Sequence, residues 1–89
     1  MKAVITVVGK DRVGIIAAVS ACLAENSVNI LDISQTILQG YFTMIMLVEL
    51  DLARSAIPEL SETLNAVGAR LGVQVRVQHE DVFTAMHRI

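Results

Sequence analysis

The first third of the chain constrains the fold most, because it joins an apolar strand to a helix through a short glycine-bounded turn. The strand is expected over Lys2–Val8, where apolar and β-branched residues follow one another almost without interruption, as in strands buried on both faces. Gly9 is expected to end this strand. An apolar helical face then runs over about Val13–Glu25. A strand that passes at once into a helix places free backbone N–H groups at one edge of a sheet.

The remainder of the chain predicts one more helix and three more strands, followed by a tail. Apolar residues over Ile57–Leu71 recur at intervals of three and four, which is the spacing of one helical face. Ser55 is expected to cap this helix and Gly72 to end it. The tail Glu80–Ile89 also has helical spacing and is predicted to form a short amphipathic helix. The three strands are expected at Val28–Leu38, Tyr41–Asp51 and Val73–Gln78, with a hairpin turn at Gln39 and Gly40.

The order of these elements, βαββαβ, predicts a ferredoxin-like α+β fold that takes up residues 1–89 as a single domain. A four-stranded antiparallel sheet would carry both helices on one face, and the short C-terminal helix over 80–89 would follow it. Right-handed crossovers place the first and third strands at the centre, in agreement with their apolar composition. The second strand has polar residues late on both faces, so it is expected at an edge.

The composition favours a homodimer and excludes several classes of protein. With 89 residues, of which 54% are hydrophobic and 18% charged, the chain has more apolar surface than a small monomer easily hides. The dimer is compatible with edge-to-edge joining of two sheets and with face-to-face packing. The net charge of −2 gives no general attraction to nucleic acid or membranes, and 3% of aromatic residues is too few for an RNA-stacking sheet. No apolar run is long enough to span a bilayer, so a cytoplasmic location is expected.

The turn at residues 9–14 is the best candidate for a ligand site. Unpaired N–H groups and the helix dipole at the start of the first helix favour a carboxylate or a phosphate. Asn29, at the start of the second strand, offers both a hydrogen-bond donor and an acceptor. In the simpler alternative, Asp11 caps the helix itself by accepting a hydrogen bond from the N–H of Val13 or Gly14. The residues alone leave both interpretations open.

At these residues the chain resembles the ACT domain, a small regulatory module. The resemblance rests on Gly-Lys-Asp-Arg-Val-Gly-Ile at 9–15 and on Asn-Ile-Leu-Asp-Ile at 29–33. Residues 29–46 and the ending Met-His-Arg-Ile at 86–89 are similar to a family of small stand-alone ACT-domain proteins of prokaryotes without an assigned function. The similarity covers nearly the full length of the chain, so it implies the same fold as the order of elements does.

The resemblance implies a non-catalytic regulatory protein that binds an amino acid or a similar small effector at a dimer interface, without a cofactor. The ligand would lie between the first turn and the second strand. Because the chain has no attached catalytic or DNA-binding domain, its effect would pass through a separate partner protein. Arg12 adds a cationic side chain that could assist an anionic ligand. Carried over by position, the residues expected to line the ligand are Asp11, Val13, Gly14, Ile15, Asn29 and Ile30.

Two other functions stay open. One is a ligand-free interaction module, in which the sheet and the apolar tail dock a separate protein. The other is an enzyme, because a small phosphatase of the same fold uses an arginine in this turn and an asparagine on the next strand, which invites comparison with Arg12 and Asn29. The glycine and aromatic pattern of that phosphatase turn does not match, and no nucleophile–base pair is apparent. No catalytic residues are therefore expected.

The remaining reactive side chains have ordinary structural interpretations. Cys22 is expected to be a buried, inert thiol, and a single cysteine excludes an intramolecular disulfide. His79, Asp81 and His87 would meet at a metal only if the tail folds back, and a pair of exposed histidines is the ordinary interpretation. No metal site is therefore expected.

Overall fold

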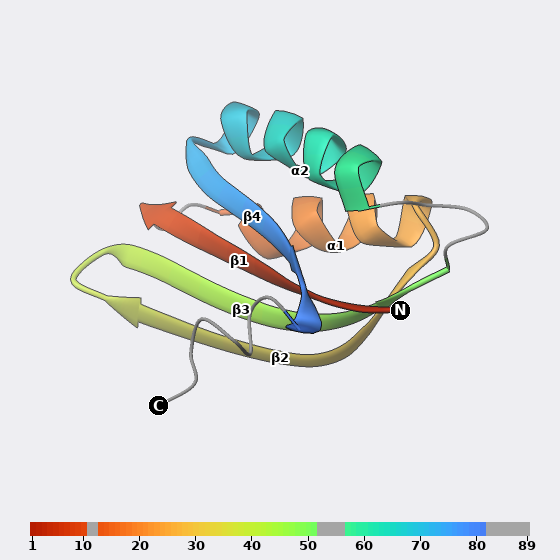
Figure 1. The fold of residues 1–89 in the computed structure, drawn as a ribbon. Coiled ribbons are helices and arrows are strands. Elements are labelled where there is room, and N and C mark those ends of the chain that lie inside the picture. Colours follow the sequence, from red (N-terminus) through yellow and green to blue (C-terminus); the bar gives the residue numbers. More distant parts are fainter. Residues whose placement is uncertain (11–12, 52–56, 82–89) are drawn as a thin grey trace.

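The computed structural model describes residues 1–10, 13–51 and 57–81, and it has the predicted βαββαβ order (Figure 1). The ferredoxin-like α+β fold is thus confirmed. The predicted C-terminal helix over 80–89, apart from its first two residues, and the predicted caps Asp11 and Ser55 lie outside the described residues. The elements are β1 (Lys2–Lys10), α1 (Ile15–Glu25), β2 (Val28–Leu38), β3 (Tyr41–Leu50), α2 (Ile57–Leu71) and β4 (Val73–His79).

The sheet has the strand order β2-β3-β1-β4, so β1 and β3 lie at its centre, as predicted. All three strand pairs are antiparallel. Both helices cover one face of the sheet, and the opposite face, called the open face below, carries neither of them (Figure 1). Lys2 pairs with Glu49 at one end of the sheet and Lys10 pairs with Tyr41 at the other. The chain therefore enters α1 from the Lys10 end and returns into β2 at the Lys2 end.

The core lies between the sheet and the two helices, and alternate strand residues supply most of it. On β1, Ala3, Ile5 and Val7 are fully buried, because every second side chain of a strand points to the same face. The apolar stripe of α2 packs against these strands through Leu60 and Leu64, which are also fully buried, as its spacing predicted. Neither α1 nor α2, the helices of the described residues, is long and apolar enough to cross a membrane.

Glycines account for two places where the bounds of an element differ from the predicted ones. β1 continues through Gly9, which pairs with Val73 of β4. A Cβ atom on Gly9 would lie 2.7 Å from Cγ1 of Val73, so this glycine lets two strands approach closely and does not end β1. Gly14 adopts a φ of +93° in the left-handed region, and α1 begins only after it, at Ile15 and not at Val13.

β2 is an edge strand, as predicted, and it carries a bulge. The pairing with β3 shifts register between Ile30 and Asp32, so Leu31 is the extra residue. From Leu31 to the end of the strand every residue is exposed. The exposed large apolar side chains of the strand are Leu31, Ile33, Ile37 and Leu38.

Candidate functional site

The start of α1 is the part of the predicted turn that the structure describes. Gly14 is the N-cap residue, and its carbonyl accepts the first helical hydrogen bond from Ala18 N–H at 2.9 Å. Glycine has no side chain that could cap the helix, and the first turn of α1 holds no acidic residue. The N–H groups of the first turn have no acceptor within the helix, and they carry the positive end of its dipole. This end of α1 therefore suits a negatively charged group.

A cavity of about 200 Å³ opens beside this helix start. Residues 14–17 of α1 form one wall, and Gln35 and Ile37 of β2 and Phe42 of β3 form the other. Among the described residues of this lining, Gln35 contributes the only polar side chain, and the others are glycine, alanine, isoleucine and phenylalanine. The cavity thus combines an apolar surface, one side-chain amide and a helix N-terminus, a combination that fits a small amphipathic molecule.

The predicted site residues of the turn have different surroundings. Val13 is fully exposed, and Gly14 is exposed beside the cavity. Ile15 also contributes to the cavity wall, although only 1% of its surface is exposed and most of its side chain belongs to the core. Asp11 and Arg12 lie outside the described residues. Of the predicted site residues that the structure describes in this turn, Gly14 and Ile15 therefore line the cavity.

Asn29 and Ile30 lie at the far end of the sheet from this cavity. Asn29 pairs with Glu49, which itself pairs with Lys2, whereas the turn follows Lys10 at the opposite end of β1. The eight residues of β3 that separate these two ends span roughly 26 Å at about 3.3 Å per residue. Asn29 also shares the open face with Glu49, while α1 lies on the other face. A single chain therefore does not bring Asn29 to the start of α1.

This separation also bears on the comparison with a phosphatase. That comparison needs the asparagine of the second strand beside the phosphate-binding turn of the same chain, and the distance between them here is too large for one phosphate to bridge. The described residues of the turn thus form no phosphate cradle together with Asn29.

The sequence reasoning missed Gln35, Ile37 and Phe42 as lining residues. Their signal was the predicted two-residue hairpin turn at Gln39 and Gly40, which fixes the register of β2 and β3. That register sets Ile37 opposite Phe42, on the helix-covered face and at the end where α1 begins. Counting back from the turn would have identified the second wall of the cavity.

Cys22 is buried, as predicted, in the side of α1 that faces the core. Burial raises the pKa of its thiol above the ordinary value; the nearby Glu25 carboxylate raises it further, and Arg70 opposes both effects. Asn26 donates a hydrogen bond from Nδ2 to the Cys22 carbonyl at 2.7 Å and helps to end the helix there. A buried thiol with a raised pKa stays protonated at neutral pH, so it is a poor nucleophile.

The predicted exposed histidine of the described part behaves as an ordinary polar residue. Nδ1 of His79 accepts a hydrogen bond from Asp81 N–H at 3.1 Å and lies 3.6 Å from the Asp81 carboxylate. His87, the third residue of the weighed metal site, lies outside the described residues. Among the residues that the structure describes, no three His, Cys, Asp or Glu side chains gather closely enough to hold a metal ion.

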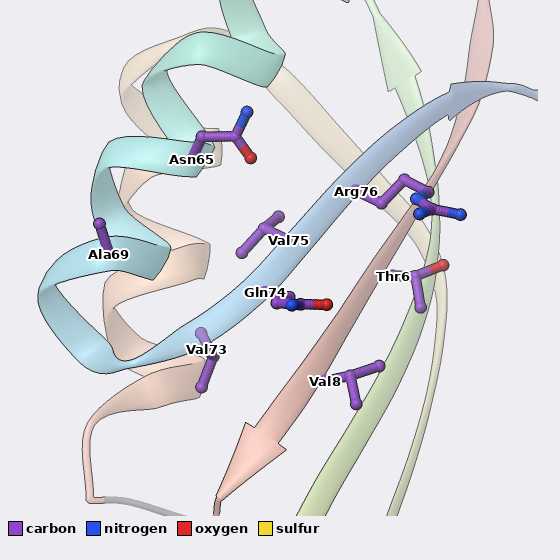
Figure 2. Close-up of a pocket in the computed structure, with 8 residues that line it drawn as sticks. All are labelled: Thr6, Val8, Asn65, Ala69, Val73, Gln74, Val75 and Arg76. Carbon is purple, nitrogen blue, oxygen red and sulfur yellow. The ribbon is translucent and has the colours of Figure 1, made fainter.

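A hollow of about 540 Å³ surrounds the other edge strand, β4 (Figure 2). Its lining residues stand on two sides of that strand. Val73 and Val75 point toward α2, where Asn65 and Ala69 lie, whereas Gln74 and Arg76 point to the open face with Thr6 and Val8 (Figure 2). Because the strand itself runs through the middle, this hollow is the exposed edge of the sheet and not an enclosed binding cavity.

Comparison with known proteins places this architecture in a family. The family model described as the ACT domain matches residues 2–78. A UPF0237 protein of Clostridium acetobutylicum is 53% identical over 89 residues, which cover 100% of both chains. The solved ACT domain protein from Streptococcus pneumoniae is 46% identical, with a TM-score of 0.82 and 98% of each chain covered.

A regulatory protein is also among the similar structures. The regulatory subunit of aspartate kinase from Thermus thermophilus, in its ligand-free form, is 29% identical with a TM-score of 0.68, over 86% of this chain and 50% of that one. The fold, the matched range and the full-length relatives agree with one another. This chain therefore belongs to the ACT-domain family of regulatory modules, and within it to the UPF0237 proteins.

Proposed function

We propose that this protein is a non-catalytic, dimeric regulatory module that binds an amino acid or a similar small carboxylate at the start of α1. The observation that carries the proposal is the helix start at Gly14. Among the described residues, no side chain caps this helix, and the cavity beside it has one polar side chain, Gln35. A carboxylate there would accept hydrogen bonds from the first N–H groups of α1. The kinship with a regulatory subunit of aspartate kinase supports the regulatory role.

Pairing of two β2 edges supports the dimer. β2 leaves one side of its backbone without a strand neighbour in the described sheet, and its exposed Leu31, Ile33, Ile37 and Leu38 would be covered by a second copy. The other edge strand, β4, presents Gln74 and Arg76 at its surface and is far less apolar. Two copies related by a twofold axis would join through the same strand, which becomes antiparallel to itself.

This pairing would also place β2 of the partner subunit beside the ligand site. With the twofold axis at Ile33, the middle of β2, residue 29 of one copy stands opposite residue 37 of the other. Ile37 lines the cavity at the start of α1. Asn29 of the partner subunit would therefore come to the same end of the sheet as the cavity, with its side chain on the open face and not on the helix-covered face where the cavity lies.

The cavity surfaces suggest which part of the ligand lies where. The carboxylate would face the N–H groups of α1, and the side-chain oxygen of Gln35 could accept a hydrogen bond from the ammonium group of the ligand. The rest of the ligand would rest on Ile16, Ile37 and Phe42. Interactions of an anion with a helix start are worth about 0.3–1 kcal/mol when exposed and up to about 2 kcal/mol when partly buried.

A thermal-shift screen over the twenty amino acids tests the proposal, with protein that has been unfolded, dialysed and refolded to remove bound ligand. A ligand present at about 100 times its dissociation constant stabilises the folded state by about 2.7 kcal/mol. For a domain of this size that gain raises Tm by roughly 10 °C or more. A shift that disappears in Gln35→Ala, and persists in Gln74→Ala on the open face, supports the site. No shift with any amino acid would sink it.

The second candidate is a ligand-free interaction module that acts on a separate protein. The exposed apolar residues of β2 favour it, because an apolar patch of this kind also suits a different partner. Affinity capture from the native cell separates the two functions. A stoichiometric partner that is retained by Asn29→Ala, in a protein that responds to no amino acid, favours the interaction module.

A further inference from the structure

The backbone groups on the free side of β2 decide how this edge can pair. In antiparallel strands, pairs of residues that exchange two hydrogen bonds alternate with pairs whose N–H and C=O groups point away from each other. Met1 and Leu50 exchange both bonds, at 2.7 and 3.4 Å, so every second residue of β3, counted back from Leu50, directs its backbone groups to β1. Met46 belongs to this set, and it is the partner of Ile33. The N–H and C=O groups of Ile33 therefore point away from β3.

One of these outward groups already has a partner. The carboxylate oxygen Oδ1 of Asp32 accepts a hydrogen bond from Ile33 N–H at 2.8 Å. Both residues are exposed, and this N–H lies on the side of β2 that has no strand neighbour in the described sheet. Asp32 thus supplies the acceptor that a partner strand would otherwise provide. Gln35 and Ile37 also direct their N–H groups outward, because Met44 and Phe42 belong to the same set of β3 residues as Met46.

The position of Asp32 in the strand is also distinctive. It is the only charged residue of β2, all of which the structure describes, and it follows directly after the bulge at Leu31. Charged side chains and bulges are two of the devices by which natural sheets keep an exposed edge from pairing. Both devices stand here at the middle of an edge that is otherwise rich in exposed leucine and isoleucine. The edge therefore combines an apolar surface that favours pairing with a local feature that opposes it.

Pairing of two β2 strands would disturb Asp32 in two ways. With the twofold axis at Ile33, the two Ile33 residues would exchange N–H···O=C bonds, so each Asp32 carboxylate would lose its hydrogen bond. Asp32 would stand opposite Ser34 of the partner subunit, which makes the two Asp32 side chains diagonal neighbours, roughly 7–8 Å apart on the joined open face. Two like charges at that separation repel each other. The dimer would thus lose two local bonds and gain a repulsion.

We propose that Asp32 restrains self-association through β2, so that the natural chain pairs more weakly than its apolar edge allows. Asp32 holds one of the outward N–H groups of β2 and leaves those of Gln35 and Ile37, so it weakens the pairing without preventing it. The inference rests on the edge pairing of the proposed function, and it does not depend on a ligand at α1.

The test is the dissociation constant of the dimer, measured by sedimentation equilibrium on refolded protein without added amino acids. Asp32→Ala removes both the acceptor and the charge, so it should lower the dissociation constant about tenfold, which corresponds to about 1.4 kcal/mol. Asp32→Asn keeps an oxygen acceptor and removes the charge, so its dissociation constant should lie between the two. The control Glu62→Ala removes one carboxylate from the exposed surface of α2 and should leave the constant unchanged.

Hydrogen exchange in the monomer gives a second, local measurement. In dilute protein the Ile33 amide should exchange more slowly than the Gln35 amide, after correction for the sequence neighbours of each. Both amides point outward, but only that of Ile33 donates to the one carboxylate of β2. The difference between the two amides should disappear in Asp32→Ala.

The possible failures are distinguishable. If the dimer of Asp32→Ala dissociates as readily as that of the natural chain, or more readily, the role of Asp32 is wrong and the β2 pairing stands. An Ile33 amide that exchanges as fast as that of Gln35 would also overturn the role of Asp32, because there would be no bond for the partner strand to displace. If both proteins remain monomers at millimolar concentration, the pairing itself is wrong, and this inference fails with it.

Discussion

Gly68 offers a sharp test of the packing between α2 and β4. Helix propensity predicts that Gly68→Ala stabilises the fold, whereas the contact with β4 predicts that it destabilises the fold. It lies inside α2, where alanine is favoured over glycine by about 1 kcal/mol when nothing else intervenes. In this structure, however, a Cβ atom on Gly68 would lie 2.7 Å from the carbonyl oxygen of Val73 and 3.0 Å from Cγ2 of Val75. Propensity alone therefore predicts a more stable Gly68→Ala variant, and the contact predicts a less stable one.

The contact should win, because the atom in the way belongs to the backbone. Only Gly72 separates α2 from β4, and Val73 and Val75 are paired with Gly9 and Val7 of the central strand β1. The helix can therefore move away from β4 only by straining that short connection or by opening the core. Inserting a methyl group into such a site costs about 1–3 kcal/mol, and a backbone obstacle belongs at the upper end. With the propensity gain subtracted, we expect Gly68→Ala to destabilise the fold by about 2 kcal/mol.

Urea unfolding followed by circular dichroism, at one protein concentration for all variants, measures this difference. A loss of about 2 kcal/mol corresponds to a fall in Tm of roughly 8–16 °C for a domain of this size. Asn65→Ala is the matched control, since Asn65 is exposed on the same helix and its replacement changes propensity alone. A Gly68→Ala protein as stable as the natural one, or more stable, would refute the argument from close packing.

Two further predictions concern assembly and pH. Ile33→Lys places a charge at the middle of the exposed β2 edge, so light scattering at micromolar concentration should give the mass of a monomer. The control Gln74→Lys, on the other edge strand β4, should leave a dimer. A dimer in both variants would contradict pairing through β2. Because the pKa of the Cys22 thiol is raised in the folded state, unfolding releases a proton above the ordinary thiol pKa of about 8.5. The free energy of unfolding should therefore fall as pH rises past that value, by at most about 1.4 kcal/mol per pH unit, and this fall should be absent from Cys22→Ala.

The sequence was sufficient for the fold because its periodic signals were strong and mutually consistent. Apolar spacing in α2, alternation in β3 and β4 and the apolar β1 each predicted an element that the structure contains. The errors arose where one residue has two physical uses. Gly9 is a typical residue for the end of a strand, but here it permits a close approach of β4, and a distant contact of this kind leaves no local trace in the sequence. The bulge at Leu31 is similar, because an extra apolar residue in an exposed edge strand breaks no visible pattern.

The candidate site was harder to predict than the fold, for a geometrical reason. A sequence motif does not say at which end of a sheet each of its residues lies. The resemblance therefore assigns Asn29 and the turn to one ligand site, although a single chain holds them far apart. Gln35 and Ile37 reach the cavity through the register of a hairpin. That register can be counted from the sequence once the turn type is known, but no chemical motif draws attention to it.

The unequal edges of the sheet have a consequence for how far assembly can proceed. A sheet with two adhesive edges can add copies at both and grow into an open fibre. Here the β2 edge carries exposed isoleucine and leucine side chains, whereas the β4 edge carries the exposed polar side chains of Gln74 and Arg76. If β2 joins to the same strand of a second copy, as proposed above, the only strongly apolar edge among the described strands is covered on both molecules. The difference between the two edges would then stop assembly at two copies.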